Sequence, residues 1–341
     1  MERRWRRGNV KPFRLLKTPW LVLEKVITLM DPPQIVQLVI CSKRTRSVVK
    51  AFTARQHYNL HFEALPNLMV SLHARKTYDV FNFTFSEEKL HHHLGYRVAW
   101  HNFRRPHLTD QLYIMRNLVA KLMSLYKITF ELVELNLDYW VDSHPELIYR
   151  WLNSFGDRIQ EAKIFGDSVS GPSYQLFLKN FGFSKCAHLN VNSTGFHLER
   201  IFPMFPEDLH ITQANWVTRE YLSSLENCVT VHLEEPNFLS DQFINLFLHC
   251  LIRGCNPKLE YIKFNLRREY SGERVLREIL TFHDDSERVF RRNGIEQLDE
   301  GGHYLQLCSG EIATIFFYPN EENADAEPES IGVVVWRNKE K

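Results

Sequence analysis

The chain has 341 residues, of which 44% are hydrophobic and 24% are charged, a composition typical of folded globular proteins. Its 42 Lys and Arg nearly balance its 41 Asp and Glu, so charge gives no reason to expect nucleic acid or an anionic membrane as a partner. Because no run of about 18 uninterrupted apolar residues occurs, we expect no membrane span. The length suits two domains, or a small module and a larger domain, in a cytoplasmic or nuclear protein.

The six cysteines are scattered and form no C-x-x-C pair, which indicates reduced thiols inside a cell. The sequence has no glycine-rich phosphate loop and no nucleophile motif, so we predict no catalytic residue and no cofactor. The HHH run at residues 91–93 lacks a cysteine or carboxylate at ligand spacing. We therefore also predict no metal site.

Residues 1–12 form a basic N-terminus that we predict to be flexible. The RRWRR run at residues 3–7 could contact nucleic acid or serve as a nuclear import signal. A disordered basic flank is the simpler interpretation, and we expect no nucleic-acid partner.

Residues 13–55 predict three short helices. The prediction rests on an apolar face and on capping residues, namely Leu23, Val26, Ile27, Met30, Asp31, Gln34 and Ser42. So small a unit has little core of its own, and Trp20, Leu21 and Val22 are left over. Either these helices cap the rest of the chain, or they bind another protein.

The segment TPWLVLEKVITLMDPPQIVQLVICSKRTRSV, residues 18–48, resembles an F-box of the nematode-type family that pairs this module with a type-2 F-box-associated domain. The resemblance continues through NWVTREYLSSLENCVTVHLEEPNFLSDQFINLFLHCLIRGCNPKLEYIKFNL and the ending IGVVVW. The sequence departs from the usual pattern at Thr18, where Leu normally precedes the proline, and at Trp20.

The resemblance implies that the F-box binds the Skp adaptor of a cullin complex, and that the C-terminal domain holds an unknown protein substrate. It implies adaptor contacts at Leu16, Pro19, Leu23, Val26, Ile27, Ile35 and Leu38.

Residues 56–130 predict a strand-rich connecting region. LMVSLHA, YDVFNFTF and YRVAWHN are predicted strands, and Phe81, Phe83 and Phe85 would share one face. A helix capped by Thr109 should follow. Its apolar side would contain Leu112, Met115, Leu118, Val119 and Leu122.

From residue 131 an L-x-x-L-x-L frame repeats six times. The frames are Leu132–Leu135–Leu137, Ile159–Ala162–Ile164, Cys186–Leu189–Val191, Pro206–Leu209–Ile211, Cys228–Val231–Leu233 and Leu259–Ile262–Phe264. Their central residues are 27, 27, 20, 22 and 31 positions apart, and helical patterns fill the gaps. This spacing favours an irregular leucine-rich-repeat-like domain of strand–helix units. The polar residue that should end each frame is mostly missing, so a non-repeating α/β domain is the alternative.

The predicted fold class is therefore α+β or α/β, with a three-helix F-box at 13–55, a connecting region at 56–130 and an F-box-associated domain at 131–341. Two apolar strands, EIATIFFYP and SIGVVVWRN, would end this domain as a hairpin around an acidic loop.

Polar residues inside the frames should face outward on the sheet. The candidate substrate contacts are Asn136, Asp138, Lys163, Asn190, Asn192, His210, His232 and Lys263. A solvated sheet face explains any one of them; as a set they suit the capture of another protein.

The hypothesis from the sequence is a non-catalytic substrate receptor of a cullin-RING ubiquitin ligase, acting in proteasomal degradation. One alternative is a binding scaffold that no longer recruits the adaptor. The departure from the usual pattern at Thr18 is the reason to consider it. The other is an uncharacterised enzyme in the C-terminal region.

Overall fold

The computed structural model describes residues 15–65, 68–75, 79–84, 98–102, 108–140, 145–155, 159–180, 182, 184–194, 206–236, 240–265, 270–282, 289–292, 295–298, 302–318 and 330–337. The basic run at 3–7, the HHH run at 91–93, Phe85 and most of the acidic loop lie outside these residues. The chain divides into two compact units. Unit 1 is Met1–His61 with Asn67–Thr129, and unit 2 is Phe62–Pro66 with Phe130–Lys341.

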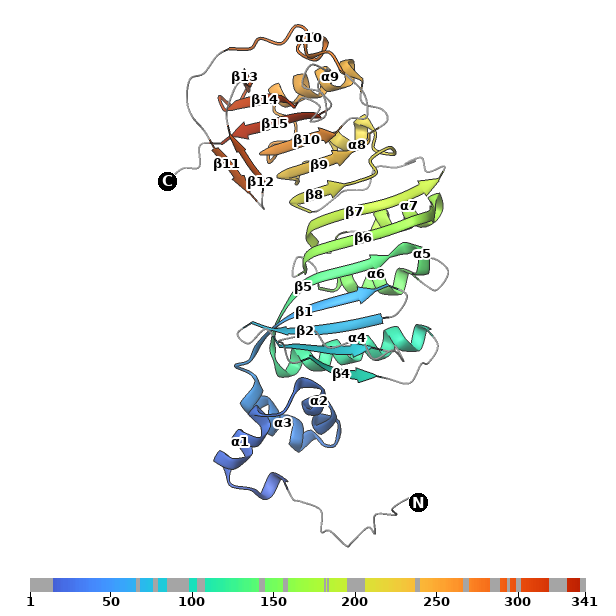
Figure 1. The fold of residues 1–341 in the computed structure, drawn as a ribbon, viewed down its shortest axis with the longest axis vertical. Helices are drawn as coiled ribbons and strands as arrows, with labels where there is room; N and C mark the ends of the chain where they lie inside the picture. Colours follow the sequence, from blue (N-terminus) through green and yellow to red (C-terminus); the bar gives the residue numbers. More distant parts are fainter. Residues whose placement is uncertain are drawn as a thin grey trace, which may run out of the picture. The chain divides into compact units, whose positions relative to one another are not determined.

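Unit 1 begins with a short 3-10 helix and the three predicted helices (Figure 1). The bounds are η1 Leu15–Lys17, α1 Trp20–Thr28, α2 Pro32–Ile40 and α3 Lys43–Thr53. The predicted caps are confirmed. The backbone N–H of Asp31 donates to Gln34 Oε1 at 3.0 Å, and the N–H of Thr45 donates to Ser42 Oγ at 3.0 Å. These bonds satisfy donors that the first turn of a helix leaves unpaired.

The rest of unit 1 is a strand group with one long helix, which gives the front helices a surface to pack on. The elements are β1 His57–Ala64, whose last three residues belong to unit 2, β2 Leu68–Ala74, β3 Val80–Thr84, β4 Val98–Asn102 and α4 Leu108–Leu125. Helix α2 packs against β3 and β4, and α3 packs against α4. The buried hydroxyl of Thr53 at the end of α3 donates to the carbonyl of Leu125 at 2.9 Å. The front helices are therefore part of a larger core.

Two details in unit 1 differ from the sequence prediction. Strand β1 was not predicted, although Tyr58, Leu60, Phe62 and Ala64 alternate and are buried. Strand β3 is buried on both faces, because Asn82 and Thr84 are covered as well as the phenylalanines. The predicted apolar side of α4 is confirmed, and the helix begins at Leu108, one residue before the predicted cap.

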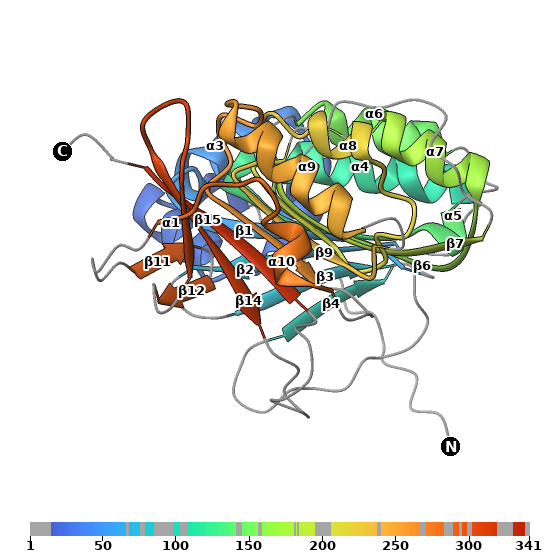
Figure 2. The same cartoon turned by 90° about the horizontal axis from the view of Figure 1, so that it is seen from above.

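Unit 2 contains six parallel strands whose order in the sheet is their order in the sequence. They are β5 Lys127–Asn136, β6 Ile159–Ser170, β7 Ser184–Thr194, β8 Asp208–Ile211, β9 Thr230–Glu234 and β10 Tyr261–Asn265. The connecting helices are α5 Leu137–Trp140, α6 Pro145–Asn153, α7 Gly171–Asn180, α8 Arg219–Ser223, α9 Asp241–Ile252 and α10 Gly272–Val275. Figure 2 shows α6 to α9 together on one side of these strands. The other sheet face is left for polar side chains.

The strand pairing corrects two of the six predicted frames. The buried row runs through Val133, Ala162, Ala187, Leu209, Val231 and Ile262. The frames centred on Leu135 and Leu189 are therefore each two residues too far along the chain. Side chains on a strand alternate between the two sheet faces with a period of two. An error of two residues therefore assigns each side chain to the correct face but to the wrong partner on the neighbouring strand.

Unit 2 ends in an antiparallel extension of the same sheet. Strands β13 His303–Gln306, β14 Ile312–Tyr318 and β15 Ser330–Trp336 follow in the order β13-β14-β15-β10, so the predicted terminal hairpin is confirmed. Strands β11 Val289–Arg292 and β12 Ile295–Leu298 form a separate pair. The protein is thus of mixed α/β class with three N-terminal helices, and its kinship to leucine-rich repeats stays a prediction. No helix within the described residues is long and apolar enough to cross a membrane.

Candidate functional site

The first candidate surface lies on the front helices of unit 1. Five large apolar side chains are exposed there, and we call them the front apolar surface: Trp20, Leu21, Val22, Leu29 and Ile40. Leu21 and Leu29 are 76% and 72% exposed, and the ring of Trp20 rests on Phe52 with centroids 4.5 Å apart. Several exposed large apolar side chains on so small a helical segment are typical of a protein-binding surface.

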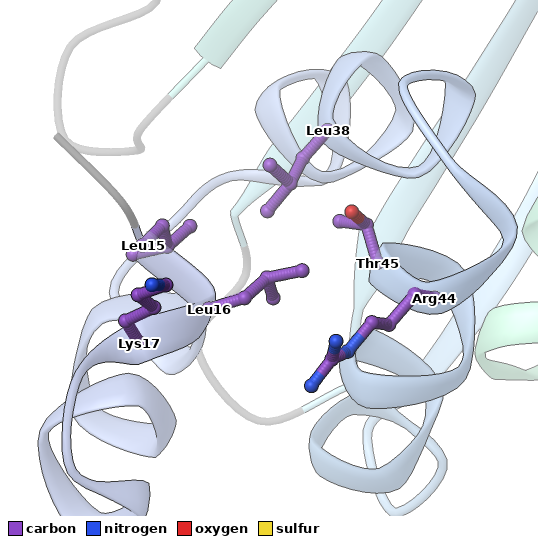
Figure 3. Close-up of a pocket in the computed structure, with 6 residues that line it drawn as sticks. All are labelled: Leu15, Leu16, Lys17, Leu38, Arg44 and Thr45. Carbon is purple, nitrogen blue, oxygen red and sulfur yellow. The ribbon is translucent and has the colours of Figure 1, made fainter. Parts of the chain in front are cut away.

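A groove of about 440 Å³ lies between η1, α2 and α3. It is lined by Leu15, Leu16, Lys17, Leu38, Arg44 and Thr45. Figure 3 shows Leu16 and Leu38 pointing into the groove from opposite sides, with the Arg44 side chain at its edge. The groove therefore combines apolar walls with cationic groups, which suits an apolar side chain flanked by acidic ones.

The structure distributes the seven predicted adaptor residues over two environments. Leu23, Ile27 and Ile35 are buried inside unit 1, where they hold the helices together. Pro19 is exposed, while Leu16, Val26 and Leu38 are half-buried. Only these last four are accessible to a partner in this conformation, and a role in binding stays a prediction for all seven.

The sequence departures at the start of α1 have local structural roles. The hydroxyl of Thr18 donates to the carbonyl of Leu15 at 2.7 Å and so closes the turn of η1. Trp20 begins α1 and extends the exposed apolar side. At position 18 the usual apolar side chain is thus replaced by a hydroxyl that hydrogen-bonds to the backbone three residues earlier.

The second candidate surface is a line of polar side chains across the sheet of unit 2. Strand pairing aligns one residue from each parallel strand, and we call this line the polar row: Glu134, Lys163, His188, His210, His232 and Lys263. These residues alternate with the buried row along each strand, so they point to the sheet face opposite the helices.

Ion pairs connect the first half of the polar row. The Lys163 ammonium lies 3.8 Å from Glu134 and 3.6 Å from Glu161, which precedes it by two residues on β6. The same Glu161 carboxylate lies 3.5 Å from His188 Nε2. At the far end, the Lys263 ammonium lies over the ring of Tyr318, 4.9 Å from its centroid.

The three histidines of the polar row lie against one another. The rings of His188 and His210 meet edge to face with centroids 5.5 Å apart, and those of His210 and His232 stack at 4.4 Å. His210 Nε2 is 2.8 Å from Glu234 Oε1, and His232 Nε2 is 3.2 Å from Asn265 Nδ2. The second contact requires His232 to accept at Nε2, because an amide nitrogen only donates.

Burial affects the protonation of two of these rings. Burial, together with the neighbouring His210 and Lys263, lowers the pKa of His232 to about 4. The pKa of His188 is also lowered, mainly by burial, although Glu161 opposes this shift. Neutral imidazole is thus the form of His232 at pH 7, with one nitrogen able to accept a hydrogen bond or a metal.

The predicted substrate residues are only partly brought together. Lys163, His210, His232 and Lys263 lie in the polar row. Asn190 follows His188 by two residues on β7 and so lies on the same sheet face, and Asn192 lies near the end of β7. Asp138 lies in α5, where its carboxylate accepts from the N–H groups of Asp167 and Ser168 at 2.7 and 3.0 Å. Asn136 Oδ1 accepts from the N–H of Asp138 at 2.9 Å, so both shape a turn.

His188 and Glu161 belong to this surface but were absent from the sequence prediction. The frame on β7 was placed two residues late, which put Asn190 where His188 lies. The available signal was that His188, His210 and His232 each follow a small or apolar residue of the buried row. Strand register was needed to use it.

A comparison with protein families gives a match in unit 2. Residues 197–264 match the family described as F-box associated. Within unit 2 this segment contains β8, α8, β9, α9 and nearly all of β10, and with them His210 and His232 of the polar row. No curated protein and no solved structure matches the chain. The match supports the resemblance for the F-box-associated part, while the F-box itself and a nematode-type origin stay predictions.

Proposed function

We propose that the chain is a substrate-receptor subunit of a Skp–cullin–F-box ubiquitin ligase and that it catalyses no reaction itself. One observation carries this proposal. A chain with an F-box-associated segment at residues 197–264 also begins with three helices that expose an apolar surface. In such a receptor the front helices would bind the Skp adaptor, and unit 2 would hold a protein substrate.

The exposed side of the front helices supports the adaptor part of the proposal. The front apolar surface and the groove at Leu16 and Leu38 offer a patch to cover and a cavity to fill. Apolar anchors of this kind supply most of the binding energy in protein interfaces. Ser42, Lys43 and Arg44 begin α3 beside them and add polar contacts at the edge.

The sheet of unit 2 supports the substrate part. We propose that β5 to β10 form an irregular leucine-rich-repeat array whose polar row, with Asn190, contacts the substrate. A row of mixed charges on a sheet face suits selective recognition, because wrong partners meet like charges. The receptor would accelerate ubiquitin transfer by holding substrate lysines near the conjugating enzyme, an effect of local concentration.

The first test is the affinity of the purified full chain for purified Skp adaptor, measured by biolayer interferometry. A Leu21→Asp, Leu29→Asp double variant should bind at least about tenfold more weakly, which corresponds to about 1.4 kcal/mol. Both side chains are exposed, so the fold should persist. Leu23 and Ile27 are unsuitable for this test, because truncating them would remove core contacts.

Leu280→Asp is the matched control, since Leu280 is 93% exposed and lies in unit 2. It should bind the adaptor like the wild type, and circular dichroism should show all three proteins folded. If the wild type does not bind at micromolar concentrations, or if the control loses as much affinity as the double variant, the receptor proposal is wrong.

Thr18 favours one alternative, a scaffold that binds proteins without the adaptor. Its hydroxyl is committed to the carbonyl of Leu15, so the apolar contact expected before Pro19 is missing. Thr18→Leu would restore the usual pattern. Adaptor binding only by this variant would favour the scaffold, whereas a similar affinity in both proteins would show that Thr18 is tolerated.

A further inference from the structure

A cluster of metal-ligating side chains lies at the centre of the polar row. Histidine 210 on β8 and histidine 232 and glutamate 234 on β9 each offer one ligand atom, and these atoms lie within 4.8 Å of one another. We propose that His210, His232 and Glu234 form a binding site for a divalent transition-metal ion, and that Zn²⁺ is the ion whose ligand preferences they fit.

The sheet geometry brings the three ligand groups close together. His210 and His232 are directly paired across β8 and β9, and their rings stack with an interplanar angle of 10°. The Nε2 edge of His210 points toward Glu234, and that of His232 points toward Asn265, the residue paired with Glu234 on β10. His210 therefore directs Nε2 toward the Glu234 carboxylate, and one ligand nitrogen of His232 lies within 4.8 Å of both other ligand atoms.

The distances require only small side-chain movements. With bonds of about 2.0–2.2 Å, two ligand atoms of a tetrahedral zinc site lie roughly 3.4 Å apart. His210 Nε2 and Glu234 Oε1 are now 2.8 Å apart, because they share a hydrogen bond. The ion would replace the Nε2 proton of His210. It would also replace the hydrogen bond that His232 Nε2 now accepts from the Asn265 amide.

The donor set selects the class of ion. Two imidazole nitrogens and one carboxylate suit zinc and neighbouring transition metals, whereas Ca²⁺ and Mg²⁺ prefer oxygen ligands. The side chains of His210 and Glu234 are each 29% exposed, so an ion can enter from solvent.

Three protein ligands leave a fourth coordination position open. It would face the surface along which His188 and Lys263 also lie, and a water molecule or a side chain of a bound protein could fill it. This site is independent of the proposed ligase function, because its ligands and its test do not involve the adaptor.

The test is Zn²⁺ binding by the full chain, purified without a histidine tag and stripped with a chelator. Isothermal titration calorimetry should show one site, and Co²⁺ should give the visible absorption of a tetrahedral complex. His232→Asn and Glu234→Gln should each weaken binding at least tenfold and remove the Co²⁺ signal. Mg²⁺ should not compete.

Two controls separate this site from other histidines. His188→Asn removes the third histidine of the polar row but none of the three ligands, so it should bind Zn²⁺ like the wild type. A variant with Asn at residues 91–93 removes the HHH run and should also retain the site. The proposal is overturned if Zn²⁺ does not bind, if binding disappears with the HHH run, or if His232→Asn binds normally while remaining folded.

Discussion

The front apolar surface and the polar row differ in how their side chains are supported. On α1 Leu21 is exposed, and its position depends on the opposite side of the same helix, where Leu23 and Ile27 are buried. In the polar row, by contrast, the side chains pair with one another across strands. A helix can therefore present a binding surface from one segment of the chain, whereas a sheet surface needs many segments in register.

The largest expected effect separates the two sides of α1. Leu23 is 3% exposed and Leu21 is 76% exposed. Leu23→Ala should lower the free energy of unfolding by about 2–5 kcal/mol through lost burial and a cavity. Leu21→Ala should change it by less than about 0.5 kcal/mol. Urea unfolding followed by circular dichroism measures both, and equal losses would show that α1 does not have a buried and an exposed side.

Next in size is the difference between an exposed thiol and a buried thiol. Cys41 on the front helices is exposed, whereas Cys228 of unit 2 is fully buried and burial raises its pKa to about 12. We expect Cys228 to react with a disulfide reagent at pH 8 at least about a hundredfold more slowly than Cys41. The reagent can reach Cys228 only when the structure around it opens locally. Stopped-flow absorbance gives the rates, and the amplitudes lost in Cys41→Ser and in Cys228→Ser assign the two thiols to their phases, since Cys255 and Cys308 are exposed as well. Similar rates for both thiols would contradict the buried position.

A smaller loss is expected where the polar row meets β15. Gly332 is paired with Lys263, and a methyl group on it would lie 2.8 Å from the Tyr318 hydroxyl. Gly332→Ala should destabilise the protein by about 1–3 kcal/mol, since the Tyr318 ring, over which Lys263 lies, must shift. In a Tyr318→Leu background the same change should cost much less. A double-mutant cycle in urea tests this, and additive effects would rule out the contact.

The smallest effect concerns pH and Glu63 in unit 2. Burial, helped by Glu134, raises the pKa of Glu63 to about 7 from about 4.5. The folded state therefore holds the proton more tightly, and the stability this provides is present below pH 4.5 and lost as pH rises through 7. Glu63→Gln should thus raise the melting temperature by about 1–3 °C at pH 8 and little at pH 4.5. Glu226→Gln, at an exposed position, is the control, and an equal gain at both pH values would exclude this cause.

Much of the local structure followed from the sequence because its signals are local. The caps at Asp31 and Ser42 lie within three residues of the groups they bind. The apolar side of α4 follows from a 3.6-residue period in one segment. The frames centred on Ala162, Leu209, Val231 and Ile262 were also in the correct register with one another.

The candidate surfaces were less predictable, because burial and register involve residues far apart in the chain. The apolar spacing of α1 grouped Leu23 with Ile27 and left Leu21 over, but the resemblance implied adaptor contacts for Leu23 and Ile27, which are buried inside unit 1. The two misplaced frames hid His188 from the polar row. No motif joins His210 to Glu234, which are 24 residues apart and on different strands.

The sequence by itself determined the element types, the mixed α/β class, the helix caps and the surplus of apolar residues at the front, because these depend on neighbours within a few residues. Only the tertiary structure decided which leucines are exposed and which polar side chains align across the parallel strands. Those outcomes depend on how distant segments pack and pair, and a shift of two residues along a strand preserves its hydrophobic pattern while changing every cross-strand neighbour.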